Sequence, residues 1–304
     1  MRSIALKACA KINLGLSILG RRADGYHELR TIYQSISLAD RLEIRFTRGT
    51  AGVRLDATGG YRVPAGRQNL AVRAAEAALQ ELGLRRQVII SLDKRIPPSS
   101  GLGGASSDAA AVLRAVVHLS GKRLPPHRLL HLAADLGSDV PFFLLGGRAL
   151  GLGRGEEVYP LPEMPRQHVV ILWPGEAMNT AEAYRLLDIA RDRPRLTAVR
   201  TRPTIELFCG QAARSAVPIL ANDFEPLLFR RLPRLAEAKR VLLLRGAEMA
   251  SLCGSGSALF GLFPDAAKAR RAAQELESTG ATVFLARTVS RKEFHRSGGA
   301  SRSR

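Results

Sequence analysis

The sequence has few cysteines and no long apolar run. Its three cysteines, Cys9, Cys209 and Cys253, lie far apart, and none belongs to a C-x-x-C pair. Neither a disulfide framework nor a zinc site is therefore predicted. No apolar run approaches the ~18 residues of a membrane-spanning helix. Residues 1–7 lack the apolar stretch of a signal peptide. These absences predict a protein of the reducing cytoplasm with no membrane partner.

Aromatic and acidic residues are also scarce. Aromatics make up 5% of the chain, and 27 acidic residues stand against 46 basic ones, which gives a net charge of +19. The positive charge is mostly arginine, is spread along the chain, and has little aromatic interleaving. Nucleic acid is therefore not an expected partner. The simplest interpretation is a general arginine bias, and an electric field that attracts polyanionic metabolites is the alternative.

The 304 residues are enough for one large or two moderate domains. Helical and extended patterns mix without a regular βαβ rhythm, which predicts an α+β fold. The composition shifts to proline and charge around residues 161–166, where we place a domain boundary. The predicted strands include residues 3–10, 29–38, 88–92, 169–173 and 282–286. The predicted helices include 70–82, 109–119, 127–136, 180–189, 226–232, 235–245 and 266–276, and 191–203 is a predicted loop.

The strongest chemical signal is the stretch PSSGLGGASSDAA at residues 98–110, between a predicted strand and an alanine-rich helix. Glycines permit close backbone approach, and a helix start offers unpaired N–H groups and the positive end of the helix dipole. This combination suits a triphosphate, and serine hydroxyls can donate to phosphate or ligate Mg²⁺. The stretch matches neither a Walker A loop nor a dinucleotide-binding loop. An ordinary glycine-rich connection with a serine N-cap is the alternative.

Two charged residues add to this signal. Asp139, within GSDVPFF at residues 137–143, is either a helix cap or a general base. Lys11 ends the first predicted strand and is one of only seven lysines, beside 39 arginines. A lysine next to an aspartate holds the carboxylate ionised and favours a substrate alkoxide. Taken alone, Lys11 is equally well explained as an exposed charge at a strand end.

Together these elements resemble the GHMP kinase superfamily, named for galactokinase, homoserine kinase, mevalonate kinase and phosphomevalonate kinase. Within it, the order of the motifs is similar to that of the family that acts on 4-diphosphocytidyl-2-C-methyl-D-erythritol. The resemblance runs from about residue 4 to about residue 286, and its most specific part is DGYH at 24–27. The other motifs are KINL at 11–14, GLGG at 101–104, SSDAA at 106–110, GSDVP at 137–141, NDFE at 222–225 and GSGS at 254–257.

The resemblance implies a two-domain GHMP kinase fold. A ribosomal-protein-S5-like N-terminal domain would occupy residues 1–163, a ferredoxin-like α+β C-terminal domain residues 164–288, and a disordered basic tail residues 289–304. The implied activity is ATP-dependent phosphorylation of the 2-hydroxyl of 4-diphosphocytidyl-2-C-methyl-D-erythritol, in non-mevalonate isoprenoid precursor biosynthesis. ATP and Mg²⁺ would be the cofactors, and the chain would be a monomer or a weak homodimer.

The resemblance also implies the roles of individual residues. Asp139 would be the general base and Lys11 its electrostatic partner. Tyr26 and Tyr184 would stack on the two faces of the cytosine, beside His27, and Asn13 would touch the methylerythritol. The ATP site would comprise Asn69 and Lys94 near the adenosine, and Pro97, Ser99, Ser100, Gly101, Leu102, Gly103, Gly104, Ala105, Ser106 and Ser107 around the phosphates. Mg²⁺ would be held through the ATP phosphates and by Ser107.

Two other functions compete with this hypothesis. A GHMP kinase of the homoserine or mevalonate type explains the glycine loop and Asp139 but not residues 22–27. A nucleotide- or RNA-binding protein without catalysis would have no need of Asp139 and would bind with steep salt dependence. One departure from the family pattern bears on the loop, because Ala105 stands where many members have a third consecutive glycine. Alanine fits there only if its φ is negative.

Overall fold

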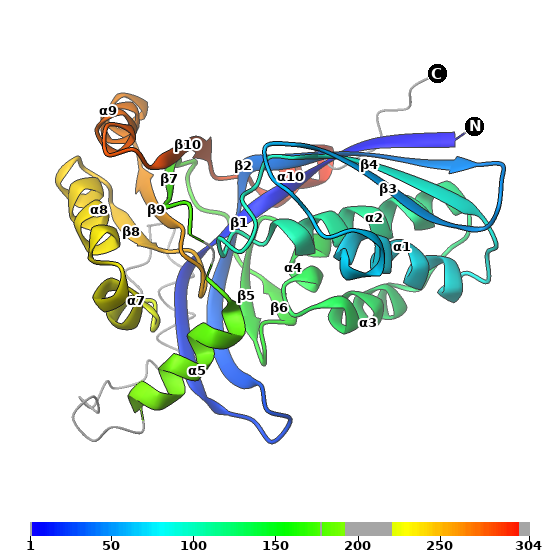
Figure 1. The fold of residues 1–304 in the computed structure, drawn as a ribbon, viewed down its shortest axis with the longest axis horizontal. Coiled ribbons are helices and arrows are strands. Elements are labelled where there is room, and N and C mark those ends of the chain that lie inside the picture. Colours follow the sequence, from blue (N-terminus) through cyan, green and yellow to red (C-terminus); the bar gives the residue numbers. More distant parts are fainter. Residues whose placement is uncertain (1, 177, 192–220, 298–304) are drawn as a thin grey trace.

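A computed structural model describes residues 2–176, 178–191 and 221–297 (Figure 1). Three predictions lie outside the described residues. They concern residues 192–203 of the predicted loop, Cys209, and the last seven residues of the predicted tail. The strands are β1 (Arg2–Arg21), β2 (His27–Thr47), β3 (Gly52–Gly59), β4 (Gln87–Lys94), β5 (Arg148–Leu152), β6 (Glu157–Pro160), β7 (His168–Trp173), β8 (Met249–Leu252), β9 (Leu259–Phe263) and β10 (Thr282–Arg287). The helices are α1 (Leu70–Glu81), α2 (Gly104–Ser120), α3 (Pro126–Leu136), α4 (Val140–Leu145), α5 (Thr180–Arg191), α7 (Glu225–Arg231), α8 (Pro233–Leu244), α9 (Ala266–Glu277) and α10 (Arg291–Ser297), with a short 3-10 helix, η1 (Gly66–Gln68).

The strands form two sheets, and the fold is α+β as the sequence predicts. The first sheet has the order β3-β4-β2-β5-β6 with β1 paired to β2, and the second has the order β10-β7-β9-β8. In the first sheet β3 runs parallel to β4, and the other pairs are antiparallel. Figure 1 shows α1 to α4 gathered on one side of the first sheet, and α8 and α9 beside the second.

The two longest strands, β1 and β2, form one antiparallel hairpin that serves both halves of the molecule. Register shifts interrupt its pairing after Cys9, Asn13 and Ile18. Such bulges bend a strand and redirect its side chains, and the first two flank Lys11 and Asn13. Near the turn of the hairpin, Leu16, Ile18 and Leu29 are buried in the core of the second half.

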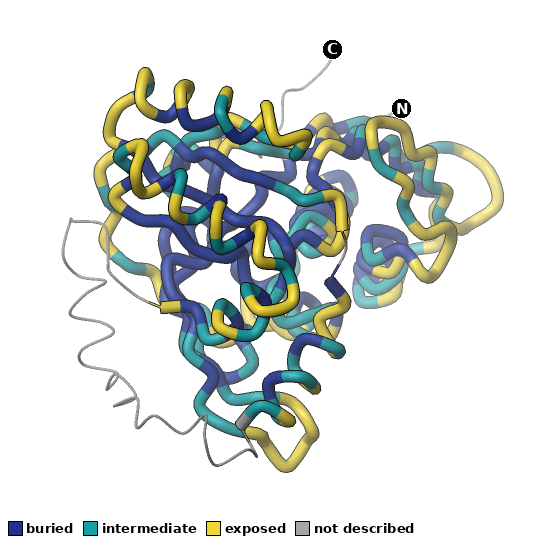
Figure 2. The backbone as a smooth tube through the Cα atoms, turned by 60° about the vertical axis from the view of Figure 1, so that its left-hand side comes forward, coloured by how far each residue is buried: buried dark blue, intermediate teal, exposed yellow. Residues whose placement is uncertain are grey.

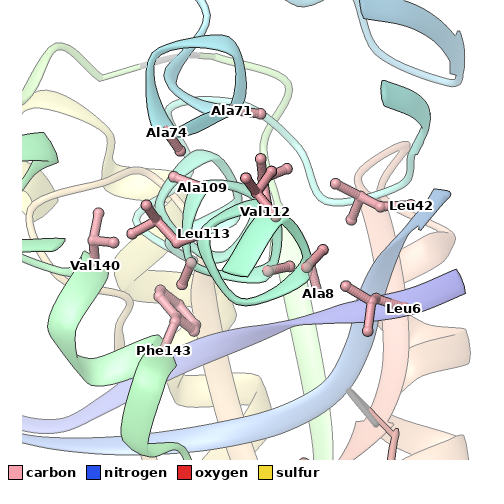
Figure 3. Packing of buried hydrophobic residues seen from close by; sticks show 14 of the residues in the cluster. Leu6, Ala8, Leu42, Ala71, Ala74, Ala109, Val112, Leu113, Val140 and Phe143 are labelled. Carbon is pink, nitrogen blue, oxygen red and sulfur yellow. The ribbon is translucent and has the colours of Figure 1, made fainter. Parts of the chain in front are cut away.

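Helix α2 is the centre of the first hydrophobic core. Its buried residues Ala109, Val112 and Leu113 pack among side chains from β1, α1 and α4, including Ala8, Ala71 and Phe143 (Figure 3). Alanines on both helices let α1 approach α2 closely, because they add little side-chain bulk. Figure 2 shows buried backbone running through the interior, with exposed residues at turns and on outer helix faces. Among the described residues, no helix has the length and apolar content needed to cross a bilayer.

The chain end departs from the prediction. We predict a disordered tail over residues 289–304, but residues 289–297 are ordered and contain α10. Val289 and Phe294 are 3% and 5% exposed and belong to the first core. The Val289 amide donates to the Ser35 carbonyl at 2.9 Å. The prediction is wrong for this part because two apolar anchors outweigh the basic composition around them.

Candidate active site

A cavity of about 950 Å³ lies between the first sheet's helices, the glycine loop and α5. Its walls come from the middle of β1, the turn of the β1–β2 hairpin, residues 97–101 and 103–106, α5 and the loop at 254–255. Segments almost 250 positions apart in the sequence therefore meet in one cleft. Most of the predicted site residues line it.

Three residues on the cavity wall are joined by an ion pair and a hydrogen bond: Lys11, Asp139 and Tyr33. The Lys11 ammonium lies 3.4 Å from one Asp139 carboxylate oxygen and donates to the Asn13 side chain at 2.8 Å. The Tyr33 hydroxyl donates to the other Asp139 oxygen at 3.0 Å. Burial and the neighbouring Asp139 raise the pKa of Tyr33 well above its ordinary value, so the hydroxyl stays protonated as a donor. The Asp139 side chain is 32% exposed, whereas the Lys11 side chain is 4% exposed, so the carboxylate is the more accessible of the two.

The glycine loop is held in place by close backbone contacts. Gly101 and Gly103 have φ of +81° and +74°, in the left-handed region that favours glycine. A Cβ on Gly101 would lie 1.6 Å from the Cys253 carbonyl oxygen, so only glycine lets the two loops touch. The Lys11 amide donates to the Leu102 carbonyl at 2.9 Å, which ties the loop to β1.

Helix α2 begins at Gly104, five residues before the predicted start at 109. Ala105 and Ser106 therefore lie in the first helical turn, where free N–H groups and the helix dipole face the cavity. Ala105 does not have a positive φ, so an alanine is accommodated without strain at this position. Ser99, with φ of +51°, is the one described non-glycine residue with a positive φ.

Two predicted loop residues do not face the cavity. The Leu102 side chain is fully buried in a hydrophobic cluster. Ser107 is 2% exposed, and its hydroxyl donates to the Cys9 carbonyl at 2.7 Å. The predicted Mg²⁺ contact through Ser107 is therefore not supported, because helical geometry turns this side chain toward β1. The neighbouring Ser106 lines the cavity instead.

Asn69 and Lys94 also line the cavity, and the Lys94 ammonium lies close to Gly104 of the glycine loop. Asn69 caps α1, accepting from the Ala71 amide at 2.9 Å. The Lys94 ammonium lies between two buried carboxyls, 2.5 Å from Asp40 and 2.7 Å from Asp108. Asp40 also accepts hydrogen bonds from the backbone amides of residues 95 and 96. Burial raises the pKa of Asp108 to about 8.

The predicted base pocket is assembled differently from the expected sandwich. Tyr26 is 54% exposed, and its ring lies 4.7 Å from the Arg154 guanidinium. The His27 ring stacks on Tyr184, with centroids 4.6 Å apart and an interplanar angle of 28°. His27 Nε2 lies 2.7 Å from an Asp188 oxygen.

Six residues that line the cavity were not predicted from the sequence: Arg21, Arg62, Asp108, Arg154, Arg185 and Asp188. Asp188 follows Tyr184 by one helical turn, so helix spacing alone places it on the same face. Asp108 lies within the motif SSDAA but was not assigned a role. The arginines carried no signal, because arginine is common throughout the chain.

Comparison with known proteins shows the class to which the chain belongs. Residues 69–147 match the family model described as GHMP kinases N terminal domain, and residues 203–282 match GHMP kinases C terminal. The chain is therefore a GHMP kinase, with the two-domain α+β fold of that class. A crystal structure of homoserine kinase from Cytophaga hutchinsonii superimposes with a TM-score of 0.67 at 20% identity over 95% of each chain, which shows the shared fold alone.

Relatives of higher sequence identity show which family of GHMP kinases the chain belongs to. The chain is 45% identical to 4-diphosphocytidyl-2-C-methyl-D-erythritol kinase of Solibacter usitatus, over 96% of this chain and 91% of that protein. It is 42% identical to the enzyme of the same name from Moorella thermoacetica, over 95% and 100%. A crystal structure of 4-(cytidine 5'-diphospho)-2C-methyl-D-erythritol kinase superimposes with a TM-score of 0.78 at 38% identity, over 94% and 99%. The chain belongs to the 4-diphosphocytidyl-2-C-methyl-D-erythritol kinase family.

Proposed function

We propose that this chain transfers the γ-phosphoryl group of ATP to the 2-hydroxyl of 4-diphosphocytidyl-2-C-methyl-D-erythritol, a step in non-mevalonate isoprenoid precursor biosynthesis. The observation that carries the proposal is the position of the Lys11–Asp139 pair. It lies in one cavity with the glycine loop and with the side chains of Tyr26, His27 and Tyr184. A nucleotide on the loop and a cytidine among the rings would both border this pair.

In the proposed reaction Asp139 accepts the proton of the 2-hydroxyl. The O–H bond breaks as the oxygen bonds to the γ-phosphorus, and the bond from that phosphorus to the bridging oxygen breaks, which releases ADP. Lys11 lies beside Asp139 and offsets the negative charge that develops on the attacking oxygen. Tyr33 fixes the carboxylate by donating to the oxygen that does not face Lys11.

The glycine loop and the start of α2 would bind the phosphates. Backbone N–H groups at Gly104, Ala105 and Ser106 have no helical partner, and the dipole favours anions there. Mg²⁺ fits this donor set. Over the described part of the chain no group of three or more acidic, histidine or cysteine side chains forms a metal site, so the nucleotide phosphates would supply most ligands. Ser106 is the nearby hydroxyl that lines the cavity, and the bound ion would neutralise phosphate charge.

The homoserine or mevalonate type is the competing function. Those kinases share the fold at 16–20% identity, which does not extend to their substrates. An aromatic and histidine cluster has no evident use for a small aliphatic alcohol. Location in the cytoplasm, a monomeric or weakly dimeric state and the lack of a nucleic-acid partner stay predictions.

Steady-state ADP release tests the proposal. We expect turnover with ATP, Mg²⁺ and 4-diphosphocytidyl-2-C-methyl-D-erythritol, and none with homoserine or mevalonate. Turnover with one of the other alcohols alone would keep the kinase class and remove the proposed substrate. No turnover with any of the three would refute the proposed reaction.

A further inference from the structure

The contact between His27 and Asp188 is not used by the proposed chemistry. His27 begins β2, whereas Asp188 lies in α5, and the contact spans 161 positions of sequence. The His27 side chain is 8% exposed and the Asp188 side chain 34%, and both residues line the cavity. The carboxylate therefore touches the imidazole at the cavity wall.

Helix α5 holds the imidazole in two ways at once. Tyr184 and Asp188 lie four positions apart, so they project from the same face of the helix. Tyr184 stacks on the face of the His27 ring, while Asp188 contacts its edge at Nε2. The Tyr184 ring is in turn packed edge-on against Phe224, with centroids 5.0 Å apart. Stacking fixes the plane of the imidazole, and the carboxylate fixes its rotation within that plane.

In a neutral imidazole, the contact also decides which ring nitrogen carries the proton. An ionised carboxylate has no hydrogen to donate, so it pairs with an imidazole nitrogen only when that nitrogen bears hydrogen. With the proton on Nε2, Nδ1 of the neutral ring is a hydrogen-bond acceptor. An acceptor pairs with an exocyclic amine, as on cytosine. It does not pair with the carbonyl that uracil carries at the equivalent position.

We infer that Asp188 is a positioning residue that fixes His27 as an acceptor and so makes the cavity selective for a pyrimidine bearing an exocyclic amine. This rests on the proposed function, because it assumes that the cytidine end of the substrate lies beside His27. A site built to pair one polar group discriminates strongly against an analogue that leaves the group unpaired. Asp188 acts through His27 and does not itself touch the reacting atoms.

The kinetic test compares Asp188→Ala, Asp188→Asn and the wild-type chain on the cytidine substrate and its uridine analogue. For Asp188→Ala we expect KM for the cytidine substrate to rise about tenfold and the cytidine-to-uridine ratio of kcat/KM to shrink about tenfold. We expect kcat and KM for ATP to stay within about twofold. Asp188→Asn should keep most of the discrimination, because its amide oxygen still accepts from Nε2–H.

Glu182→Ala is the matched control. Glu182 lies on the same helix, pairs with Arg231 at 2.7 Å, and has a 38% exposed side chain outside the cavity. We expect it to leave both the KM values and the base discrimination unchanged. An Asp188→Ala variant with wild-type discrimination, or a wild-type chain that prefers the uridine analogue, would overturn the inference.

A second readout does not depend on turnover. Nitrogen-15 NMR of labelled histidine should show the Nε2–H tautomer for His27 in the wild-type chain and a mixture in Asp188→Ala, with the signal assigned through His27→Gln. An Nδ1–H tautomer in the wild-type chain would refute the role of Asp188. Failure of the wild-type chain to turn over the cytidine substrate would instead refute the proposed function and the base selectivity with it, and the NMR result would still decide whether Asp188 sets the tautomer.

Discussion

Lys11 shows how single residues set the chemistry of the cavity. A buried ammonium without partners is costly, because burial removes its hydration. Here the ammonium donates to Asn13 and lies beside Asp139, and the Tyr33 ring is 5.5 Å away. The charge is thereby kept in a water-poor position where its effect on a developing alkoxide is largest.

Asp139→Asn tests the general-base role. The amide is nearly the same size and can still accept from Tyr33, but it cannot take a proton. We expect kcat to fall about 10²–10⁴-fold, with both KM values within a few-fold. The measurement is steady-state ADP release. Asp135→Asn, at an exposed position on α3, is the control and should behave as wild type. A near-normal kcat in Asp139→Asn would show that Asp139 is not the general base.

Asp108 gives a pH prediction. Burial raises its pKa from 3.8 to about 8, and Asp40 competes for the same lysine. A raised pKa means that the folded state holds the proton more tightly. The stability this carboxyl contributes is therefore complete below about pH 4 and lost as the pH rises to about 8.

The matching variant is Asp108→Asn, which does not titrate. Between about pH 6 and pH 9 the wild-type chain should lose about 3 kcal/mol of unfolding free energy more than the variant loses. Urea unfolding at both pH values measures this. Parallel pH profiles for the two chains would contradict the shifted pKa.

At the scale of elements, the glycine loop depends on its contact with the loop at 253–256. Gly101→Ala would place a Cβ against the Cys253 carbonyl and would strain a positive φ. We expect the loop to shift, kcat/KM for ATP to fall about 10²-fold, and the melting temperature to drop.

Ala105→Gly, four residues on, is the comparison. It lies exposed in the first turn of α2, and we expect a change within a few-fold in ATP kinetics and a loss of about 1 kcal/mol in stability. If the two variants had equal effects, the contact with the Cys253 carbonyl would not be the reason why glycine is needed at position 101.

Elements that a clear apolar periodicity marks were predictable from the sequence. The helix expected at 70–82 is found at Leu70–Glu81, and the strand expected at 169–173 at His168–Trp173, because apolar periodicity marks both. Strand β3 was missed, since it lies at the edge of the sheet and is mostly exposed, without the alternation of a half-buried strand. The start of α2 was placed too late because its first turn consists of glycine, alanine and serine, residues that are also typical of loops.

Helix α10 gives the second prediction at this scale. The Phe294 ring packs against the backbone of Gly146, where an added Cβ would lie 2.2 Å from the ring. Phe294→Ala should lower the unfolding free energy by about 3 kcal/mol, measured by urea denaturation. Lys292→Ala, on the exposed face of the same helix, should change it by less than about 0.5 kcal/mol. A Phe294→Ala variant as stable as wild type would mean that the helix does not belong to the core in solution.

For the whole molecule, the site forms because one hairpin belongs to both cores. The Leu16 amide donates to the Ala221 carbonyl, and the Ile18 amide donates to the Asp223 carboxylate at 2.9 Å. These contacts hold the second half against β1, and the loop at 254–255 adjoins Lys11, since a Cβ on Gly254 would lie 3.3 Å from the Lys11 ammonium. Sequence patterns do not encode such long-range pairing, so residue types alone left the roles of Lys11 and Asp139 open. The family resemblance, carried by the order of the motifs, predicted which residues share the site. It predicted neither the His27–Asp188 contact nor the burial of the Ser107 hydroxyl against β1.

The central claim is that this cavity phosphorylates the cytidine diphosphate ester and not a simple alcohol. The most direct measurement is a competition followed by phosphorus NMR, with ATP, Mg²⁺ and equal amounts of 4-diphosphocytidyl-2-C-methyl-D-erythritol, homoserine and mevalonate. The account predicts one new phosphate monoester, on the 2-hydroxyl of the cytidine compound. A phosphate on homoserine, on mevalonate or on another hydroxyl of the cytidine compound would contradict it.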